Sequence, residues 1–422
     1  MKDLKSFYQG FLNRSGFHIL NATILARVLS FFSSWIALQF IPNLELGLVI
    51  YAINIIALII PISGLGAYQG LLRYGSLLDS DKEKSQLFSY ILVKGSLFSI
   101  LLIIITVLLS TLLSKSLAAS KPYLIALSLS IFTLFLLESL KVQFRVLHRN
   151  KLFAKTEIIY NILFLALVTI GSYIFQEKGY IIAIIISPLI TFFLFISKIK
   201  IPFVLPTSFK KPDLAFWKYS LFTGLSNVAN QLIIVLDIIL IGVILKDPGL
   251  ITIYKYLALI PFSMLFLPRA MLTTDFVTLT KNYLDHHFIQ KYIKNYTYIF
   301  VFISLITVIF SFLFSDLILS FFGKEFIQYR SVFRILIVGI SSVLIFRGLF
   351  GNLLSSIGKA SVNYWISFFG IVINLISNYI LIPKYGIMGA AMTSAIIMWL
   401  TSLLSVILYY HFYNKIKKTA AV

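Results

Sequence analysis

Polar and charged side chains set within long apolar stretches are the residues of this sequence that could do chemistry. The first apolar stretch carries a polar helical face of residues at steps of 4, 3 and 4: Thr23, Arg27, Ser30 and Ser34. Arg27 lies about ten residues into the stretch, where a charge usually faces a protein interior or a watery cavity. We predict that Arg27, Thr23 and Ser30 bind a substrate. An arginine fixed for packing alone, by a carboxylate or by carbonyls, is the alternative.

A second polar stripe follows in the stretch that opens the other half of the chain. Asn227, Asn230 and Asp237 recur there at steps of 3 and 7. Asp237 could titrate, bind a cation or pair with Arg27, and a structural pairing is the alternative to a coupling role. We predict Asp237 as the ion- or proton-coupling residue and Asn230 as a substrate contact.

Two further side chains complete the predicted binding set. Lys255 lies near the end of its apolar stretch, so it either faces a cavity or extends to the membrane surface. Asn374 belongs to a stripe of small and polar residues, which lines a cavity or holds helices together. The other members of the stripe are Asn363, Ser367, Gly370 and Asn378. Snorkelling accounts for Lys94 and Arg347, and a local ion pair with Lys141 accounts for Glu138.

Several classes of chemistry are excluded by what the sequence lacks. It has no cysteine and no G-x-x-x-x-G-K-[ST] phosphate loop, so it holds no thiolate metal site and hydrolyses no ATP by itself. Its five histidines lack metal-ligand spacing. We therefore expect no cofactor, no metal site and no catalytic residue, and we predict that the protein is not an enzyme.

The composition requires lipid as a solvent. Of 422 residues, 59% are hydrophobic and 12% charged, with a mean hydropathy of +0.95. Soluble domains are roughly a quarter charged, so this chain has too few charges for a water-covered surface. The net charge of +21 indicates basic loops on the cytoplasmic side of a membrane, and no nucleic-acid partner is expected.

Twelve apolar windows predict an all-α membrane protein with twelve transmembrane helices. They lie near 17–40, 46–66, 88–113, 122–144, 155–175, 180–197, 219–244, 250–272, 295–315, 332–354, 362–382 and 387–411. If the N-terminus is cytoplasmic, the inner loops hold 24 Lys and Arg residues and the outer loops 8. This bias predicts that both termini lie in the cytoplasm.

The chain also divides into similar halves. We predict an N-terminal six-helix lobe at 1–197, a basic cytoplasmic connector at 198–218 and a C-terminal six-helix lobe at 219–422. Gly179, Ala183 and Ser187 recur 207 residues later as Gly386, Ala390 and Ser394. An even number of spans in each half makes the repeat parallel, with a pseudo-two-fold axis along the membrane normal.

The sequence resembles the polysaccharide repeat-unit flippases, the O-antigen and capsule exporters of the multidrug/oligosaccharidyl-lipid/polysaccharide exporter superfamily. The resemblance extends over essentially the whole chain. The matching stretches are LARVLSFFSSWIALQFIPNLELGLVIYA (25–52), GLGAYQGLLRYG (64–75), LDIILIGVILKDPGLITIYKY (236–256) and GNLLSSIGKASVNYWISFFGIVINLISNYILIPKYGIMGAAMTSA (351–395).

The resemblance implies two lobes around a central cavity that opens alternately to each side. It implies a multi-pass protein of the bacterial cytoplasmic (inner) membrane that translocates undecaprenyl-pyrophosphate-linked oligosaccharide for cell-surface polysaccharide, such as lipopolysaccharide. Membrane lipid and polysaccharide polymerase machinery are the other implied partners. An ion-coupled drug or metabolite antiporter of the same superfamily is the alternative. A membrane polymerase or glycosyltransferase is disfavoured because the outer loops are short.

Overall fold

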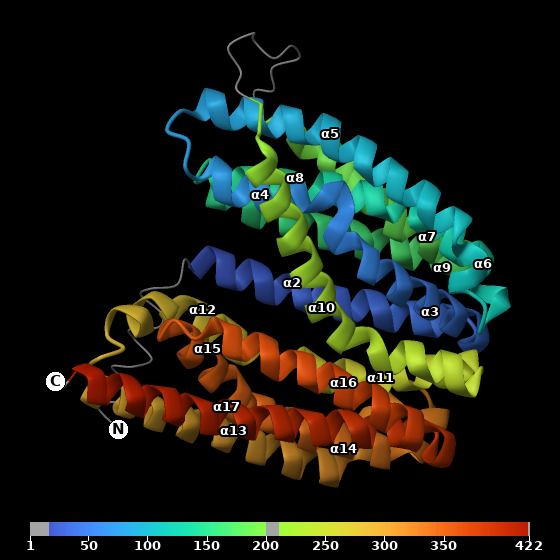
Figure 1. Ribbon diagram of the computed structural model, residues 1–422. Coiled ribbons are helices and arrows are strands. Elements are labelled where there is room, and N and C mark those ends of the chain that lie inside the picture. The colour runs from blue at the N-terminus through green and yellow to red at the C-terminus, as the bar shows by residue number, and fades with distance from the viewer. Residues whose placement is uncertain (1–16, 200–210, 421–422) are drawn as a thin grey trace. The chain divides into compact units, whose positions relative to one another are not determined.

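The computed structural model describes residues 17–199 and 211–420, and the only regular structure in this part of the chain is helical, without a strand (Figure 1). The prediction of an all-α, multi-pass membrane protein is confirmed. Helices are the expected solution for such an apolar chain, because a helix satisfies its own backbone hydrogen bonds where lipid offers none.

The helical segments of the first part agree with the apolar windows. They are α2 (Phe17–Phe40), α3 (Asn43–Ile59), the 3-10 segment η1 (Ile60–Gly66), α4 (Ala67–Gly75), α5 (Asp81–Leu108), α6 (Ser110–Leu113), η2 (Ala118–Ser120), α7 (Lys121–Ser128), α8 (Ser130–Val146), α9 (Asn150–Ile196) and α10 (Leu214–Leu245). The side chain of Asp213 caps α10 by accepting a hydrogen bond from the backbone N–H of Phe216 at 3.0 Å. The connector therefore becomes helical before its predicted end.

The second part continues the pattern. Its segments are α11 (Pro248–Ser263), α12 (Phe266–Lys281), α13 (His286–Ser320), η3 (Lys324–Tyr329), α14 (Arg330–Ser342), the π-helical turn η4 (Val343–Arg347), α15 (Gly348–Ser356), α16 (Ala360–Tyr385) and α17 (Ile387–Ala420). Nine helices among the described residues are long and apolar enough to cross a membrane, or ten if the bent α10 is one span. The count of twelve stays a prediction.

Helix α9 contains two antiparallel helices rather than one. In a continuous helix Gly171 and Gly179 would lie about 12 Å apart, yet the backbone of each blocks the place where the other would carry a Cβ atom. The chain turns back at Gln176, whose φ of 49° and ψ of −127° are not helical. The predicted break between the windows 155–175 and 180–197 is therefore present.

The same turn recurs before the last helix of the chain, and it gives a register for the predicted internal repeat. Gly386 joins α16 to α17 with φ 58° and ψ −141°, which matches Gln176, and the left-handed His148 before α9 corresponds to Gly358 before α16. Both pairs give an offset of 210 residues (176 to 386, 148 to 358). The sequence match of Gly179 with Gly386 is therefore wrong by three residues, and Gly389 is the counterpart of Gly179.

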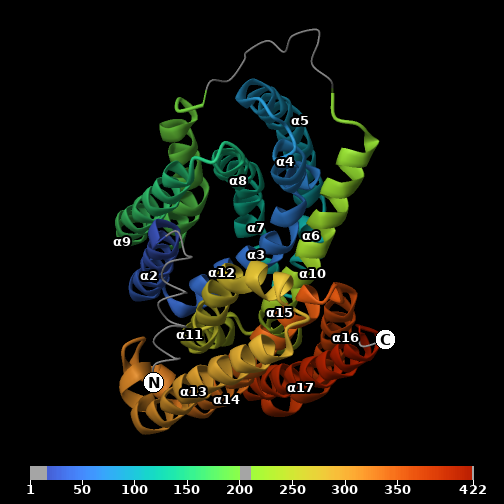
Figure 2. The ribbon, with the colours of Figure 1, turned by 90° about the vertical axis from the view of Figure 1, so that its left-hand side faces the viewer.

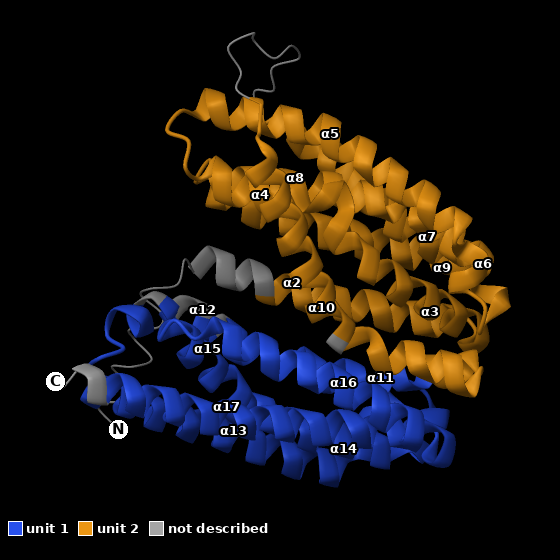
Figure 3. Cartoon of the chain, in the orientation of Figure 1, with its two compact units in different colours: residues 1–17, 253–422 blue, residues 18–252 orange. Residues whose placement is uncertain are grey.

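The chain forms two compact units, which Figure 3 colours separately. Of the described residues, the N-terminal unit contains those from 18 to 252, and the C-terminal unit contains Phe17 and those from 253 to 420. Helix α10 thus belongs to the N-terminal unit, where Gly242 packs against the ring of Tyr51 and Thr252 Oγ1 donates a hydrogen bond to the carbonyl of Asn43 at 2.7 Å. The lobe boundaries of the transporter, 197 and 219, stay a prediction, and residues 200–210 of the connector lie outside the described residues.

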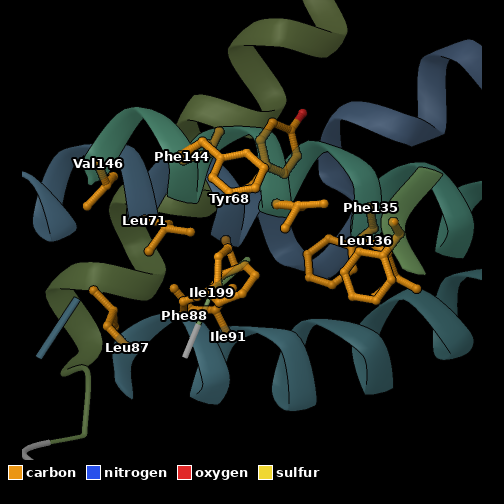
Figure 4. Close-up of a cluster of buried hydrophobic side chains, with 14 of the residues drawn as sticks. Tyr68, Leu71, Leu87, Phe88, Ile91, Phe135, Leu136, Phe144, Val146 and Ile199 are labelled. Atoms are coloured by element: carbon orange, nitrogen blue, oxygen red, sulfur yellow. The ribbon is translucent and has the colours of Figure 1, made fainter. Parts of the chain in front are cut away.

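An aromatic cluster between α4, α5 and α8 forms the core of the N-terminal unit (Figure 4). The ring of Phe135 lies where a Cβ atom of Gly64 or of Gly95 would be, so both glycines are needed for this close approach. Gly64 is also left-handed and donates its N–H to Ser99 Oγ at 3.0 Å. The second span is therefore broken at Gly64, where a side chain of α5 binds the freed backbone.

The core of the C-terminal unit is also aromatic. Tyr292, Tyr296 and Phe300 stack along α13, and Tyr409 and Tyr413 stack along α17. Helix α14 packs between these two helices, as Figures 1 and 2 show. Tyr296 Oη donates a hydrogen bond to the carbonyl of Leu344 at 3.0 Å, which ties α13 to the π-helical turn η4.

Candidate functional site

The predicted cation of the first helix is exposed. Arg27 and Ser30 both have exposed side chains on α2, and Arg27 has no ion-pair partner within the described part of the chain. Ser34, one turn further on, hydrogen-bonds to Tyr180 of α9. The Ser34 end of the polar face therefore contacts α9. Arg27, at the other end, lies on a surface of the unit rather than in a sealed helix contact, because its side chain is exposed. The side chain of Thr23 lies outside the described residues.

The two predicted residues of α10 lie in different environments. Asn230 is exposed, whereas Asp237 is 4% exposed. The helix bends by 59° between Leu214–Leu232 and Ile234–Leu245, so the bend separates the two side chains. The spacing of Asn230 and Asp237 had indicated a shared polar stripe. The structure does not place the two side chains on one exposed face of α10.

The remaining predicted residues belong to the C-terminal unit. Lys255 is half-buried on α11. Asn374 is buried on α16, where its Oδ1 accepts a hydrogen bond from Asn378 Nδ2 at 2.9 Å. An amide pair along one helix favours the structural interpretation of this part of the stripe.

Sequence reasoning underestimated a buried ionic cluster in the N-terminal unit. Lys141 Nζ on α8 lies 2.8 Å from Glu138 Oε1 and 2.6 Å from Glu157 Oε2 of α9, and the Lys141 side chain is 12% exposed. The local pair with Glu138 was predicted from its spacing. Glu157 was not, because a contact between two helices leaves no signal in sequence spacing. Two carboxylates more than neutralise this cation.

Sequence reasoning also missed a cationic cluster in the C-terminal unit. Arg347, the last residue of η4, donates through Nη1 to Asn363 Oδ1 of α16 at 2.8 Å and to Ser405 Oγ of α17 at 2.7 Å. Its Nη2 donates to Ser367 Oγ at 3.3 Å. Asn363 Nδ2 in turn donates to the carbonyl of Gly351 at 2.6 Å, which fixes the orientation of the amide. All of these acceptors are neutral.

The spacing of Asn363 and Ser367 on one helical face was the available signal for this cluster. Arg347 was assigned to snorkelling because it lies near the end of its span. The π-helical turn that aims it at α16 could not be foreseen from apolar spacing. Among the described residues no group of His, Asp and Glu is arranged to hold a metal ion.

Comparison with solved structures identifies the fold. An inward-facing multidrug-resistance MATE transporter of the MOP superfamily superposes with a TM-score of 0.78 and 15% identity, over 93% of this chain and 96% of that one. The lipid II flippase MurJ in an inward closed conformation gives 0.73 and 20% identity, over 94% and 89%. A MOP superfamily transporter from Pyrococcus furiosus, described as having a binding pocket of reversed polarity, gives 0.69 and 14% identity over 96% of each chain.

Comparison with curated sequences gives local matches. The capsular polysaccharide biosynthesis protein CapF of Staphylococcus aureus is 34% identical over 158 residues, which is 36% of each protein. An uncharacterized membrane protein of Methanocaldococcus jannaschii is 34% identical over 99 residues, 22% of this chain and 19% of that protein. The chain thus matches about a third of the length of the first relative and a fifth of the second. No family model matches the chain.

The chain has the fold of the MOP superfamily transporters, as the resemblance of its motifs predicted. The solved structures that it resembles are transporters and flippases. The local sequence match is to a protein of polysaccharide biosynthesis.

Proposed function

We propose that the protein is a flippase that moves undecaprenyl-pyrophosphate-linked oligosaccharide repeat units from the cytoplasmic to the outer leaflet of the bacterial cytoplasmic membrane. The observation that carries the proposal is the exposed guanidinium of Arg27 on the first helix of a MOP-type fold. The local identity to a capsular polysaccharide biosynthesis protein supports the same substrate class. The products would supply O-antigen or capsule synthesis through a polysaccharide polymerase.

The chemistry of the cargo suits this arrangement. A pyrophosphate carries several charged oxygens, and a guanidinium binds such oxygens through paired, charge-assisted hydrogen bonds. Lys255 adds a second cation, and Thr23, Ser30, Asn230 and Asn374 supply neutral contacts for phosphate or sugar hydroxyl groups. A hydrocarbon environment would oppose entry of this headgroup, so the cations must be reached from a hydrated space.

Alternating access supplies the movement in this proposal. One half rocks against the other, so that the headgroup is reached first from the cytoplasm and then from the outside. Because the sequence contains no ATP-binding loop, the driving force is an ion gradient or the membrane potential acting on charges of the site. Asp237 is the proposed coupling group, and both termini remain in the cytoplasm.

Replacement of Arg27 tests the headgroup role. In a strain that lacks the chromosomal copy, we expect Arg27→Gln to reduce glycan export roughly tenfold or more, because a charge-assisted contact is lost. Arg27→Lys should retain part of the activity, since it keeps the charge without the paired N–H groups. The measurement is the ratio of surface polysaccharide to intracellular lipid-linked repeat units.

Lys94→Gln is the matched control, because Lys94 is an exposed cation within a span of α5 and has no assigned role. Its export should equal that of the wild type. Wild-type export by Arg27→Gln at equal protein abundance would remove the headgroup role of Arg27.

A second candidate function is drug or metabolite antiport. It is favoured by the TM-score of 0.78 with a multidrug-resistance transporter, against 0.73 with the lipid II flippase. Loss of the gene would then lower resistance to cationic drugs and leave glycan export intact. The flippase proposal expects the reverse pattern.

A further inference from the structure

The Arg347 cluster combines a permanent cation with a neutral, oriented environment. The hydrogen bonds to Asn363, Ser405 and Ser367 leave the guanidinium Nε–H and one Nη2–H without an acceptor among the described residues. An arginine remains charged in proteins, and a charge within a membrane span is costly unless a counter-charge or water compensates it. The neutral acceptors hold the guanidinium in place and leave its charge uncompensated.

The corresponding seam of the N-terminal unit contains a cation whose charge is compensated by a carboxylate. With the offset of 210 residues, Ser367 of α16 corresponds to Glu157 of α9, and both lie where the helix packs against the preceding span. Glu157 forms an ion pair with Lys141 at 2.6 Å, whereas Ser367 gives Arg347 only a hydroxyl oxygen at 3.3 Å. The C-terminal unit therefore has a half-buried cation in this seam and lacks the carboxylate that its counterpart supplies.

The surroundings of Arg347 leave it open to a ligand. A Cβ atom at Gly351 would lie 3.4 Å from Arg347 Nη1 and 3.5 Å from Asn363 Oδ1, so this glycine adds no bulk beside the guanidinium. Gly351, Asn363, Ser367 and Arg347 are all half-buried rather than sealed in the core. The hydroxyl of Ser355, a further half-buried group, receives the second hydrogen of Asn363 Nδ2 at 3.0 Å.

We propose that Arg347, with Asn363 and Ser367, forms an oxyanion-binding site in the C-terminal unit, separate from Arg27, that takes a phosphate or carboxylate group. The anion would accept hydrogen bonds from the Nε–H and the remaining Nη2–H, which is the paired geometry that arginine offers to such groups. The hydroxyl of Ser367 would donate a third. The site can be filled by an anionic lipid headgroup or by a soluble anion, and it does not depend on which cargo the protein moves.

Binding by the purified full-length protein tests the site. In the first arm, inorganic phosphate is titrated against chloride at equal ionic strength, and the thermal unfolding midpoint is measured in detergent. In the second arm, native mass spectrometry measures retention of phosphatidylglycerol against phosphatidylcholine. We expect wild-type protein to respond in at least one arm. A response to phosphatidylglycerol alone identifies a lipid headgroup as the ligand, and a response to phosphate alone identifies a soluble anion.

Three variants locate the response. Arg347→Gln should weaken it roughly tenfold or more, because the charge and the paired donors are lost. Ser367→Glu should abolish it, because the new carboxylate occupies the guanidinium as Glu157 occupies Lys141, and this variant is expected to fold. Lys94→Gln, which removes an exposed cation of the other unit, should respond like the wild type. Because Arg27 is retained in all three variants, loss of the response in Arg347→Gln and Ser367→Glu separates this site from the proposed headgroup role.

The proposal is overturned if neither probe affects the wild type, or if Ser367→Glu responds as the wild type does. A purely structural Arg347 would give an unstable Arg347→Gln variant without any anion dependence in the wild type. If Arg347→Gln does not fold, modification of Arg347 by phenylglyoxal in the wild type decides the question. Phosphate or phosphatidylglycerol should slow that modification at least severalfold, and an unchanged rate overturns the proposal.

Discussion

The seams around Lys141 and Arg347 are related through Glu157 and Ser367, which lie 210 residues apart, and they solve the problem of a cation in a membrane helix differently. In the N-terminal unit, Lys141 is enclosed by the carboxylates of Glu138 and Glu157. In the C-terminal unit, Arg347 is held by an amide and two hydroxyl groups. The first arrangement ties helices together by charge, whereas the second keeps a charge available.

This difference shows how two similar helix contacts can serve different roles. The charge of Lys141 is neutralised by carboxylates of its own unit and cannot attract an anionic ligand, so the role of this lysine is structural. The charge of an arginine with neutral partners is not cancelled. The fixed orientation of Asn363 holds the guanidinium of Arg347 in place, so that an anion can bind without further rearrangement. The backbone turn at Gln176 recurs at Gly386. The role of each seam follows from whether carboxylates lie beside its cation.

Removal of Lys141 should have the largest effect. Lys141→Met leaves two carboxylates facing each other in a mostly buried seam, so we expect a loss of about 3–5 kcal/mol in the free energy of unfolding. Unfolding in mixed micelles with increasing dodecyl sulfate measures it. The triple variant with Glu138→Gln and Glu157→Gln is the control and should recover most of the loss. A stable Lys141→Met protein would contradict the ionic role of this seam.

Removal of Arg347 should be milder. Arg347→Met leaves only neutral acceptors behind, so we expect a loss of about 1–2 kcal/mol, clearly less than that of Lys141→Met, in the same unfolding experiment. Wild-type protein saturated with the probe that it binds, phosphate or phosphatidylglycerol, should be further stabilised, and Arg347→Met should not be. If Arg347→Met is as unstable as Lys141→Met, the two seams are equivalent and the contrast drawn between them is wrong.

The paired turns should give the smallest effect. Gln176 and Gly386 have the same left-handed backbone, which a glycine adopts without steric cost. We expect Gln176→Gly to stabilise the protein by up to about 1 kcal/mol and Gly386→Gln to destabilise it by a similar amount. A shift of the unfolding midpoint in opposite directions for the two variants checks this. Equal signs would mean that the two turns are held by different contacts.

The spans could be predicted from the sequence because their cause is local. A window of about 20 apolar residues has few alternatives to a membrane helix, and each of the predicted windows is helical apart from one or two turn residues. The register of the repeat was predicted less well. Glycine identity misaligned Gly179 with Gly386, because the shared feature is a backbone conformation, and in one half a glutamine adopts it.

The candidate site was predictable only where one helix carries the signal. The exposure of Arg27 agrees with its polar face, and the Asn363 and Ser367 stripe was visible as spacing. The bend of α10, which separates Asn230 from Asp237, and the contact of Glu157 with Lys141 depend on packing between helices. A single sequence does not record such contacts.

Helix α13 has a practical consequence. From its start to the non-helical residue Phe314 it extends for about 42 Å, whereas the hydrocarbon core measures about 30 Å. Its first turns carry His286, His287, Lys291 and Lys294, and this polar end is held in place because Ile289 is buried and His286 stacks on Tyr413 of α17. A helical fusion partner joined in phase to that end would turn rigidly with the helix, and would give a small membrane protein the external landmark that imaging of single particles requires.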